Sequence, residues 1–354
     1  MPRSLSGRAM AALLLVGGFF SSSPPLHIDK TETKDQLYSL NHKMTKEELQ
    51  QERSYSSNMT KEELEQELEE MFVGREPLRK TLIDIFIWAQ DLRDRQEIDN
   101  STIRRTLMHT VFIGNPGTGK TMVAKKLGDI FKSFGLAKSG HVVEALRGDL
   151  VGESSKQTAQ NVERQMQKAK DGILFVDEAY RLSSSSDAVE EILLRLNATN
   201  DFILILAGYP DEMQKLFLMN NGLPRRFYQI IKLDDYTPHE LTKICNRQAH
   251  ERGYVLDQAA EQKFLELLDK NCSNPSLERQ GPDGEKVYES IISQYNAGLC
   301  DHLLFAAEKE KALRMEQKRG SLSRIEWKRE INELKEEDFT KGFEKWLSES
   351  SQLR

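Results

Sequence analysis

Short apolar runs alternate with helical spacing of apolar residues through the central part of the chain. Five runs have the length and composition of strands: residues 110–113, 141–145, 172–176, 201–207 and 227–233. Before them, residues 77–95 place Leu78, Leu82, Ile85, Phe86 and Ala89 on one face of a predicted helix. Strands separated by helical stretches predict a five-stranded parallel sheet covered on both faces, an α/β fold.

The strand pattern ends near residue 234. Thr237 and Glu240 have the spacing of a helix start, and helical patterns continue to residue 347. Residues 274–284 read as a loop, and residues 308–337 as an exposed, charged helix pair interrupted at Gly320. We therefore expect an α/β domain over residues 70–234, followed by a helical domain with a charged tail over residues 235–354.

Residues 26–69 are polar and contain a short repeat. The sequence Met-Thr-Lys-Glu-Glu-Leu occurs at residues 44–49 and again at 59–64. In each copy a threonine precedes a glutamate by three residues, the spacing of a helix capping box. We interpret this segment as a helical linker exposed to solvent.

Residues 1–25 predict a targeting segment. Arg3 and Arg8 precede an apolar run, residues 9–20, that is too short to span a bilayer. Signal and transit peptides both fit, and a two-step plastid signal combines them. We expect a plastid location. The alternatives are the mitochondrion, the secretory path and an untargeted cytoplasmic protein.

Overall composition narrows the classes of partner and site. The 354 residues carry a net charge of −6, which gives no electrostatic reason to expect nucleic acid as the main partner. Cys245, Cys272 and Cys300 are far apart, which argues against a zinc site and against a disulfide framework.

A glycine-rich segment between the first predicted strand and the next predicted helix fits the phosphate-binding pattern G-x-x-x-x-G-K-[ST]. We expect the following residues to bind nucleotide: Gly114, Asn115, Pro116, Gly117, Thr118, Gly119, Lys120, Thr121 and Met122. Lys120 is expected to reach the β- and γ-phosphates, and the Thr121 hydroxyl to ligate Mg²⁺. The alternative is a glycine turn that fits by chance.

A second motif, which is acidic, follows the predicted strand 172–176. Asp177 is expected to hold Mg²⁺, and Glu178 to polarise the attacking water as general base. Two acids after a strand can also be a helix-capping turn. Downstream of a phosphate-binding loop, the pair favours ATP hydrolysis.

The adenine needs a pocket outside the phosphate-binding loop. Val73 and Gly74, which follow Phe72 before the first long helix, could supply apolar contact and backbone polar groups. A packed helix entry is the alternative interpretation.

From about residue 72 to residue 343 the chain resembles the CbbX/CfxQ family of AAA+ ATPases, which is related to stage V sporulation protein K. The matching stretches are residues 73–74, 114–121, 149–152, 172–180, 205–210, 221–223 with 226–227, and 337–339. The resemblance implies an AAA+ module with a helical lid, ATP bound between them and hexameric rings. The best-known members are red-type Rubisco activases, which act on the Rubisco large subunit.

The resemblance also assigns roles to individual residues. Lys120 and Glu178 match the hydrolytic core of the family, as do Thr121 and Asp177. Tyr209 falls near the sensor 1 position. Arg226 matches an arginine finger that reaches the γ-phosphate of the neighbouring subunit; a surface arginine before an edge strand is the alternative.

Three positions depart from the family pattern. Ser154 stands where the pore loop of the family has an aromatic residue. Pro224 replaces the first arginine of the finger segment, with Arg225 in the middle position. Gly298 stands where the lid arginine of sensor 2 is expected.

These observations leave two functional hypotheses. The first is an ATPase that uses ATP and Mg²⁺ in a hexameric ring to remodel a protein client, which the resemblance suggests could be the Rubisco large subunit. The second is a nucleotide-binding regulatory subunit, without motor activity, of a ring mixed with a related chain. The phosphate-binding residues favour the first hypothesis, and Ser154 and Gly298 favour the second.

Overall fold

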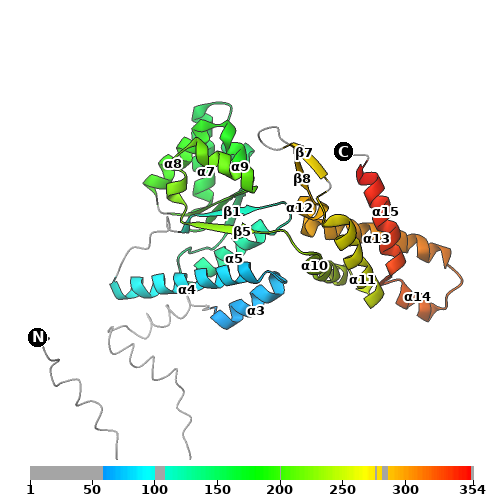
Figure 1. The fold of residues 1–354 in the computed structure, drawn as a ribbon. Helices are drawn as coiled ribbons and strands as arrows, with labels where there is room; N and C mark the ends of the chain where they lie inside the picture. The colour runs from blue at the N-terminus through cyan, green and yellow to red at the C-terminus, as the bar shows by residue number, and fades with distance from the viewer. Residues whose placement is uncertain (1–58, 100–107, 200, 276, 281–285, 352–354) are drawn as a thin grey trace, which may run out of the picture. The chain divides into compact units, whose positions relative to one another are not determined.

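The computed structural model describes residues 59–99, 108–199, 201–275, 277–280 and 286–351 (Figure 1). The predicted targeting segment, residues 1–25, and the first copy of the repeat lie outside the described residues. All described residues belong to one compact unit, Ser56–Arg354.

Five parallel strands form the central sheet in the order β2-β3-β4-β1-β5. The strands are β1 (Thr110–Gly114), β2 (Val142–Ala145), β3 (Ile173–Val176), β4 (Ile203–Gly208) and β5 (Gln229–Leu233). In the central strand β1, Val111 pairs with Leu206 of β4 and with Ile230 of β5. The predicted parallel sheet is confirmed, with strand ends that differ from the predicted runs by at most two residues.

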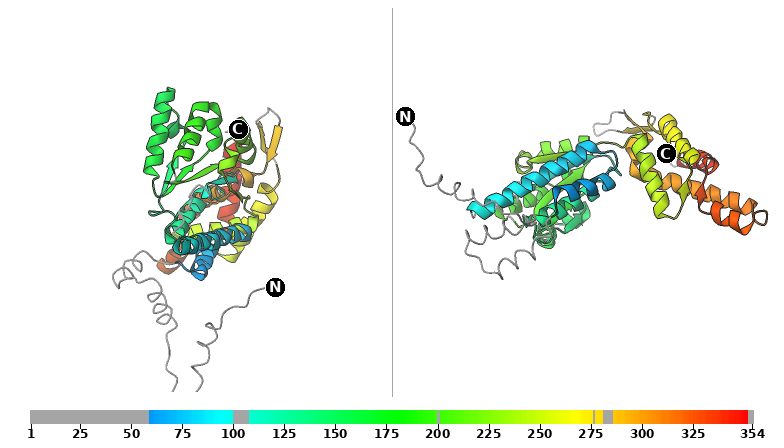
Figure 2. Two further views of the ribbon diagram at one scale, coloured as in Figure 1. Left: turned by 90° about the vertical axis from the view of Figure 1, so that its left-hand side faces the viewer. Right: turned by 90° about the horizontal axis from the view of Figure 1, so that it is seen from below.

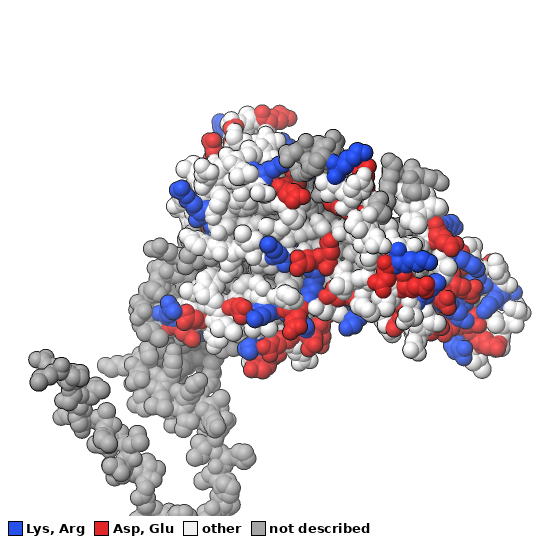
Figure 3. All heavy atoms as spheres, in the orientation of Figure 1, with Lys and Arg blue, Asp and Glu red and all other residues white. Residues whose placement is uncertain are grey.

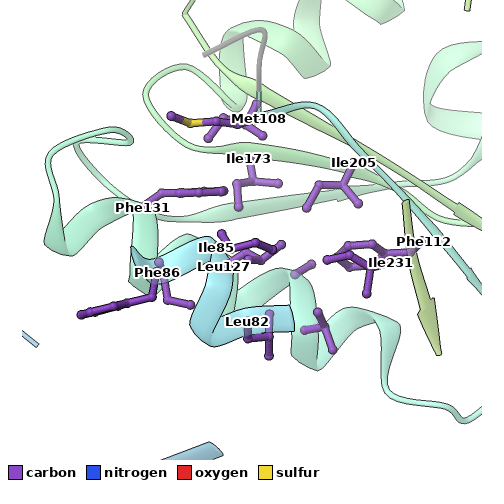
Figure 4. Close-up of a cluster of buried hydrophobic side chains, with 14 of the residues drawn as sticks. Leu82, Ile85, Phe86, Met108, Phe112, Leu127, Phe131, Ile173, Ile205 and Ile231 are labelled. Atoms are coloured by element: carbon purple, nitrogen blue, oxygen red, sulfur yellow. The ribbon is translucent and has the colours of Figure 1, made fainter. Parts of the chain in front are cut away.

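Helices α3 (Lys61–Met71), α4 (Glu76–Asp99) and α5 (Lys120–Ser133) cover one face of the sheet (Figures 1 and 2). Their apolar side chains pack against Phe112, Ile173 and Ile205 (Figure 4). The five apolar residues predicted for one face of the first long helix are all buried on α4. Burial of this stripe against the sheet provides the main stabilisation of the helix.

The other face of the sheet is covered by α6 (Arg147–Leu150), α7 (Ser155–Lys168), α8 (Ser186–Ala198) and α9 (Pro210–Met219). Val111, Leu174 and Leu206 point to this side, whereas their neighbours Phe112 and Phe175 point to the first. Successive side chains of a strand face opposite ways, so both layers are supplied by the same strands. This is the three-layer arrangement that the sequence predicts.

Helix α3 corrects the interpretation as a solvated linker for residues 61–69, the end of the predicted segment 26–69. The predicted capping box is present, since Thr60 Oγ1 accepts from Glu63 N at 3.1 Å. However, Leu64 and Leu68 are fully buried in the core beneath the sheet, as is Phe72. Their spacing of four residues makes a narrow apolar stripe within a charged helix. The second copy of the repeat is therefore part of the packed fold.

The carboxyl-terminal part is mainly helical. Its helices are α10 (Pro238–Glu251), α11 (Gln258–Leu267) with its extension η4 (Leu268–Cys272), α12 (Ile291–Tyr295), α13 (Ala297–Gln317), α14 (Arg324–Glu330) and α15 (Glu336–Ser351). They enclose a separate core that includes Phe264, Leu304 and Phe339. Helix α10 begins with the predicted capping box of Thr237 and Glu240.

Two short strand pairs were not expected in this part. β6 (Val255–Leu256) pairs with β9 (Glu333–Leu334), and β7 (Leu277–Gln280) pairs with β8 (Lys286–Glu289). The prediction of a plain loop over residues 274–284 was therefore wrong for β7. Strands of two to four residues are too short to show an alternating pattern, and β6 and β9 are far apart in the sequence.

The charged region 308–337 is not uniformly exposed, which also corrects the prediction. The interruption near Gly320 is confirmed, because α13 ends at Gln317 and α14 begins at Arg324. Arg314, however, is buried and donates to both carboxylate oxygens of Asp338, at 2.9 and 2.8 Å. Two parallel hydrogen bonds of this kind compensate for the hydration that a buried guanidinium loses.

The described residues include all three cysteines and the helices that can be examined for a membrane span. Cys245, Cys272 and Cys300 are buried free thiols. Within the described ranges, no group of three or more histidine, cysteine or carboxylate side chains could hold a metal ion. No described helix combines the length and hydropathy that a membrane span requires.

One buried histidine lies just before the central strand. His109 is 2% exposed, and its Nδ1 accepts a hydrogen bond from Leu204 N at 3.0 Å. The ring lies near Phe202 and Phe227, and Nε2 has no hydrogen-bond partner among the described residues. Burial lowers the pKa of His109 from 6.5 to about 4.

This shift predicts a loss of stability in mild acid. Between pH 6.5 and pH 4 the unfolded histidine is protonated and the folded one is not, so stability falls as pH falls through this range. Between pH 7 and pH 4, we expect His109 to cost the unmodified protein about 3 kcal/mol of unfolding free energy. His109→Gln keeps an acceptor for Leu204 N but does not titrate, so this loss is expected to be absent in the variant. Denaturant titrations of both proteins at several pH values check this. If the unfolding free energies of the two proteins fall equally as the pH is lowered, the prediction is wrong.

Candidate functional site

The glycine-rich segment connects β1 to α5 as predicted. Gly117 and Gly119 have φ angles of +69° and +93°, a conformation that residues with a Cβ rarely adopt. The loop ends at the amino terminus of α5, where unpaired backbone N–H groups and the helix dipole favour an anion. The local geometry is therefore suited to binding phosphate.

Lys120 lies over the loop. Its Nζ donates to the carbonyl oxygens of Gly114 at 3.0 Å and Asn115 at 2.9 Å. The side chain is buried, and this burial lowers the pKa of Lys120, while the nearby carboxylates of Asp177 and Glu178 oppose the shift. A cation in a partly dehydrated position interacts strongly with a bound anion.

Asp177 and Glu178 follow β3 directly. Asp177 Oδ1 accepts from the backbone N of Glu178 at 2.9 Å, and Glu178 has a φ of 49°. Glu178 Oε2 pairs with Arg181 Nε at 3.1 Å, and Oε1 accepts from the Tyr180 hydroxyl at 3.3 Å. Tyr180 and Arg181 lie in η2 (Ala179–Ser184), the turn that follows Glu178. The Glu178 carboxylate therefore lies beside two hydrogen-bond donors from the adjacent turn.

Tyr209, the predicted sensor 1 residue, follows β4 and precedes α9. Its ring centroid lies 5.7 Å from Lys120 Nζ and 5.3 Å from the ring of Tyr180. Burial, together with the negative charge of Glu178 and Asp177, raises the pKa of Tyr209 to about 12. The phenol is therefore neutral near pH 7 and can donate a hydrogen bond.

The segment predicted to contact adenine lies between α3 and α4. Val73 is half-buried, and the Glu240 side chain of α10 packs closely against Gly74. Beside it is a cavity of about 520 Å³, within the size range of small-molecule sites. Gly74 and Arg75 line this cavity together with Thr237 and Glu240.

Arg226 lies at the end of η3 (Pro224–Arg226), before β5. Its Nη2 donates to Asn197 Oδ1 at 2.7 Å, and Nη1 to the carbonyl of Gly222 at 3.5 Å. Arg225 is exposed in the same turn. These contacts place Arg226 at the ends of α8 and α9, whereas Lys120 lies at the start of α5, after the glycine-rich loop.

The three departures from the family pattern have distinct structural settings. Ser154 caps α7, accepting from Gln157 N at 3.3 Å. A Cβ added at Gly298 would meet no atom within 4 Å in the part of the chain that the structure describes. Pro224 begins the η3 turn, a position that its fixed φ suits.

Asp235 was not among the site residues predicted from the sequence. This carboxylate accepts from the side chains of Asn115 and Asn296, which are far apart in the sequence. A signal was available, because Asp234 and Asp235 follow β5 as Asp177 and Glu178 follow β3.

Charged side chains are interspersed on the visible face of the protein. In Figure 3, acidic and basic groups alternate over the α/β part and over helices α13 to α15. This distribution agrees with the balanced composition of 50 basic and 56 acidic residues.

Comparisons with known families and relatives agree with these motifs. Residues 110–234 match the ATPase family associated with various cellular activities (AAA), and residues 237–349 match the AAA lid domain. Stage V sporulation protein K of Bacillus subtilis is 35% identical over 62% of this chain and 71% of its own length. Protein CfxQ of Xanthobacter flavus is 32% identical over 70% of this chain and 82% of its own.

A third relative is the chloroplastic ribulose bisphosphate carboxylase/oxygenase activase of Cyanidioschyzon merolae. It is 34% identical over 59% of this chain and 74% of its own length. Chloroplastic proteins are thus among the relatives of this chain.

Solved structures show the same fold. The Thermotoga maritima RuvB Holliday junction branch migration motor has a TM-score of 0.50 at 17% identity, covering 78% of this chain and 70% of that one. The FIGL-1 AAA domain in complex with ADP also has a TM-score of 0.50, at 18% identity, covering 76% and 80%. With the intact phosphate-binding and acidic motifs, these matches show that the chain is an ATP-hydrolysing member of the CbbX/CfxQ family of AAA+ ATPases.

Proposed function

We propose that this ATPase works as a ring of subunits that couples ATP hydrolysis to the remodelling of a protein client. The observation that carries the proposal is that Lys120 Nζ bonds to the glycine loop at Gly114 O, close enough to Asp177 and Glu178 for their negative charges to favour a higher Lys120 pKa. These groups combine phosphate binding with a base for water.

The donor set fits ATP with Mg²⁺. Thr121 is the second residue of α5, and Asp177 directly follows β3. Their hydroxyl and carboxylate oxygens are donors that suit a hard divalent cation. These two residues would hold the ion, which would neutralise charge at the phosphates. Backbone N–H groups of the loop and Lys120 bind the phosphate oxygens and stabilise the charge that develops on the leaving group.

Glu178 orients the attacking water and accepts its proton. In the structure its carboxylate pairs with Arg181, so taking up this role requires exchange of that ion pair for a contact with water. The neutral Tyr209 phenol, near Lys120, donates a hydrogen bond in the same site. The lid and the segment of Val73 and Gly74 enclose the adenine.

Arg226 acts on the site of the neighbouring subunit. It lies at the ends of α8 and α9, near exposed apolar side chains on the same helices: Leu194, Leu218 and Met219. Exposed apolar groups beside an arginine are typical of a protein interface. An arginine supplied across this interface stabilises the charge built up during phosphoryl transfer.

The relatives support a proposal for the client and for the compartment. One relative is a chloroplastic Rubisco activase, which favours a plastid location directed by residues 1–25 and a client related to the Rubisco large subunit. The second candidate, a regulatory subunit in a mixed ring, is favoured by the helix-capping role of Ser154, which gives that position no aromatic surface for gripping a client.

The role of Glu178 predicts a separation of binding from turnover. Glu178→Gln keeps the size of the side chain but removes the base, so we expect kcat to fall by about 100-fold or more. ATP affinity is expected to change little. Glu190→Gln, an exposed position on α8, is the matched control. Phosphate release and a fluorescent-nucleotide titration measure the two quantities. Unchanged turnover would remove Glu178 from the mechanism.

The role of Lys120 predicts a loss of binding itself. Lys120→Ala removes the cation that contacts the phosphates, and we expect ATP affinity to fall by about 100-fold or more. Lys125→Ala changes an exposed lysine of the same helix and serves as control. The same titration decides the outcome: equal affinities of the two variants contradict the assignment of the loop as the phosphate site.

A further inference from the structure

A single carboxylate lies between the phosphate-binding loop and the lid. Asp235, in the segment between β5 and α10 (Figure 1), accepts four side-chain hydrogen bonds. Asn115 Nδ2 donates to its two oxygens at 3.0 and 3.2 Å, Asn296 Nδ2 to Oδ1 at 2.9 Å, and Ser293 Oγ to Oδ2 at 2.6 Å. We call these four residues the Asp235 junction.

Backbone contacts reinforce the lid side of the junction. Asn296 Oδ1 accepts from Tyr236 N at 2.9 Å, so this side chain is bonded at both ends to the hinge segment. Asn296 is fully buried and has a φ of 47° and a ψ of −126°. A non-glycine residue in such a conformation persists only where its surroundings hold it. It forms the corner between α12 and α13.

The same corner touches the glycine loop. Ala297 N donates to the Gly117 carbonyl at 3.3 Å. A Cβ added to Gly117 would lie 2.3 Å from the carbonyl oxygen of Tyr295, so only a glycine allows this approach. The phosphate-binding loop and the lid corner are therefore in direct contact beside Asp235.

On its other side, Asn115 is bonded to the catalytic lysine. Its carbonyl oxygen accepts from Lys120 Nζ at 2.9 Å and from Thr118 Oγ1 at 2.8 Å. Asn115 thus joins Lys120 through its backbone and Asp235 through its side chain. A shift of Lys120 towards a phosphate would change its hydrogen bond to the Asn115 carbonyl. The resulting movement of Asn115 would change the hydrogen bonds from its side chain to Asp235.

We propose that Asp235 is a positioning residue that couples the phosphate-binding loop to movement of the lid. The inference rests on the proposed function, since it requires that Asn115 and Lys120 bind the phosphates of ATP. Hydrogen bonds from both sides converge on one carboxylate, so displacement of Asn115 pulls on the α12–α13 corner through Asp235. This contact links loop and lid although Gly298 offers no side chain at the sensor 2 position.

A double-mutant cycle tests the coupling. The proteins are the full chain, Asn115→Ala, Asp235→Ala and the double variant. Asp234→Ala, which removes an exposed acid one residue away, is the matched control. For each protein we would measure ATP affinity, kcat and the slowing of amide hydrogen exchange in residues 291–297 when ATP is added.

We expect each single variant to lower kcat by about tenfold, an ordinary coupling between hydrogen-bonded neighbours. Asp235→Ala keeps most of its ATP affinity but loses the ATP-dependent protection of residues 291–297. The double variant is no worse than the worse single variant, because either change already breaks the link. Asp234→Ala behaves as the unmodified chain does.

Two results would overturn the inference. In the first, the fold-losses of kcat in the two single variants multiply in the double variant, which means that the two residues act independently. The other is a parallel fall of ATP affinity and kcat in Asp235→Ala, which means a structural role only. If Asp235→Ala does not fold, Ser293→Ala removes one lid-side donor, and undiminished protection by ATP in that variant overturns the inference. Failure of the unmodified chain to bind ATP would instead refute the proposed function.

Discussion

The parallel direction of the five strands is the constraint on which the site depends. All carboxyl ends meet at one edge of the sheet, so each connection after a strand contributes to the same region. The phosphate-binding loop follows β1, Asp177 follows β3, Tyr209 follows β4 and Asp235 follows β5. Residues separated by more than a hundred positions become neighbours because the sheet brings their strands side by side.

Burial sets the chemistry at that edge. The Lys120 ammonium is dehydrated, and the nearby carboxylates of Asp177 and Glu178 partly offset the effect on its pKa. The hydroxyl of Tyr209 adds a neutral donor, and burial raises its pKa to about 12, further above neutral pH. In such a site the electrostatic interactions with phosphate are stronger than in water, and the groups are already oriented.

Local patterns predicted much of the fold. The apolar runs gave the five strands, and the glycine spacing placed the loop at the start of α5. Thr237 and Glu240 identified the start of α10 because a capping box is a local signal. Each of these features depends on residues within a few positions of one another.

The features that the sequence did not reveal depend on distant contacts. Helix α3 looked solvated because Leu64 and Leu68 are outnumbered by acidic neighbours, and only the sheet gives them something to pack against. The strand β6 pairs with residues almost eighty positions away. The bonds from Asn115 and Asn296 to Asp235 likewise join three segments that no short motif connects.

The central claim is that catalysis needs Glu178 of one subunit and Arg226 of the next. Mixing Glu178→Gln with Arg226→Ala tests it most directly, with ATP turnover of each variant alone as reference. If the two residues act across a subunit interface, each variant alone is nearly inactive, and the mixture regains turnover because some interfaces combine an intact Glu178 with an intact Arg226. Two inactive variants that stay inactive when mixed, although mixed assemblies form, would contradict the claim.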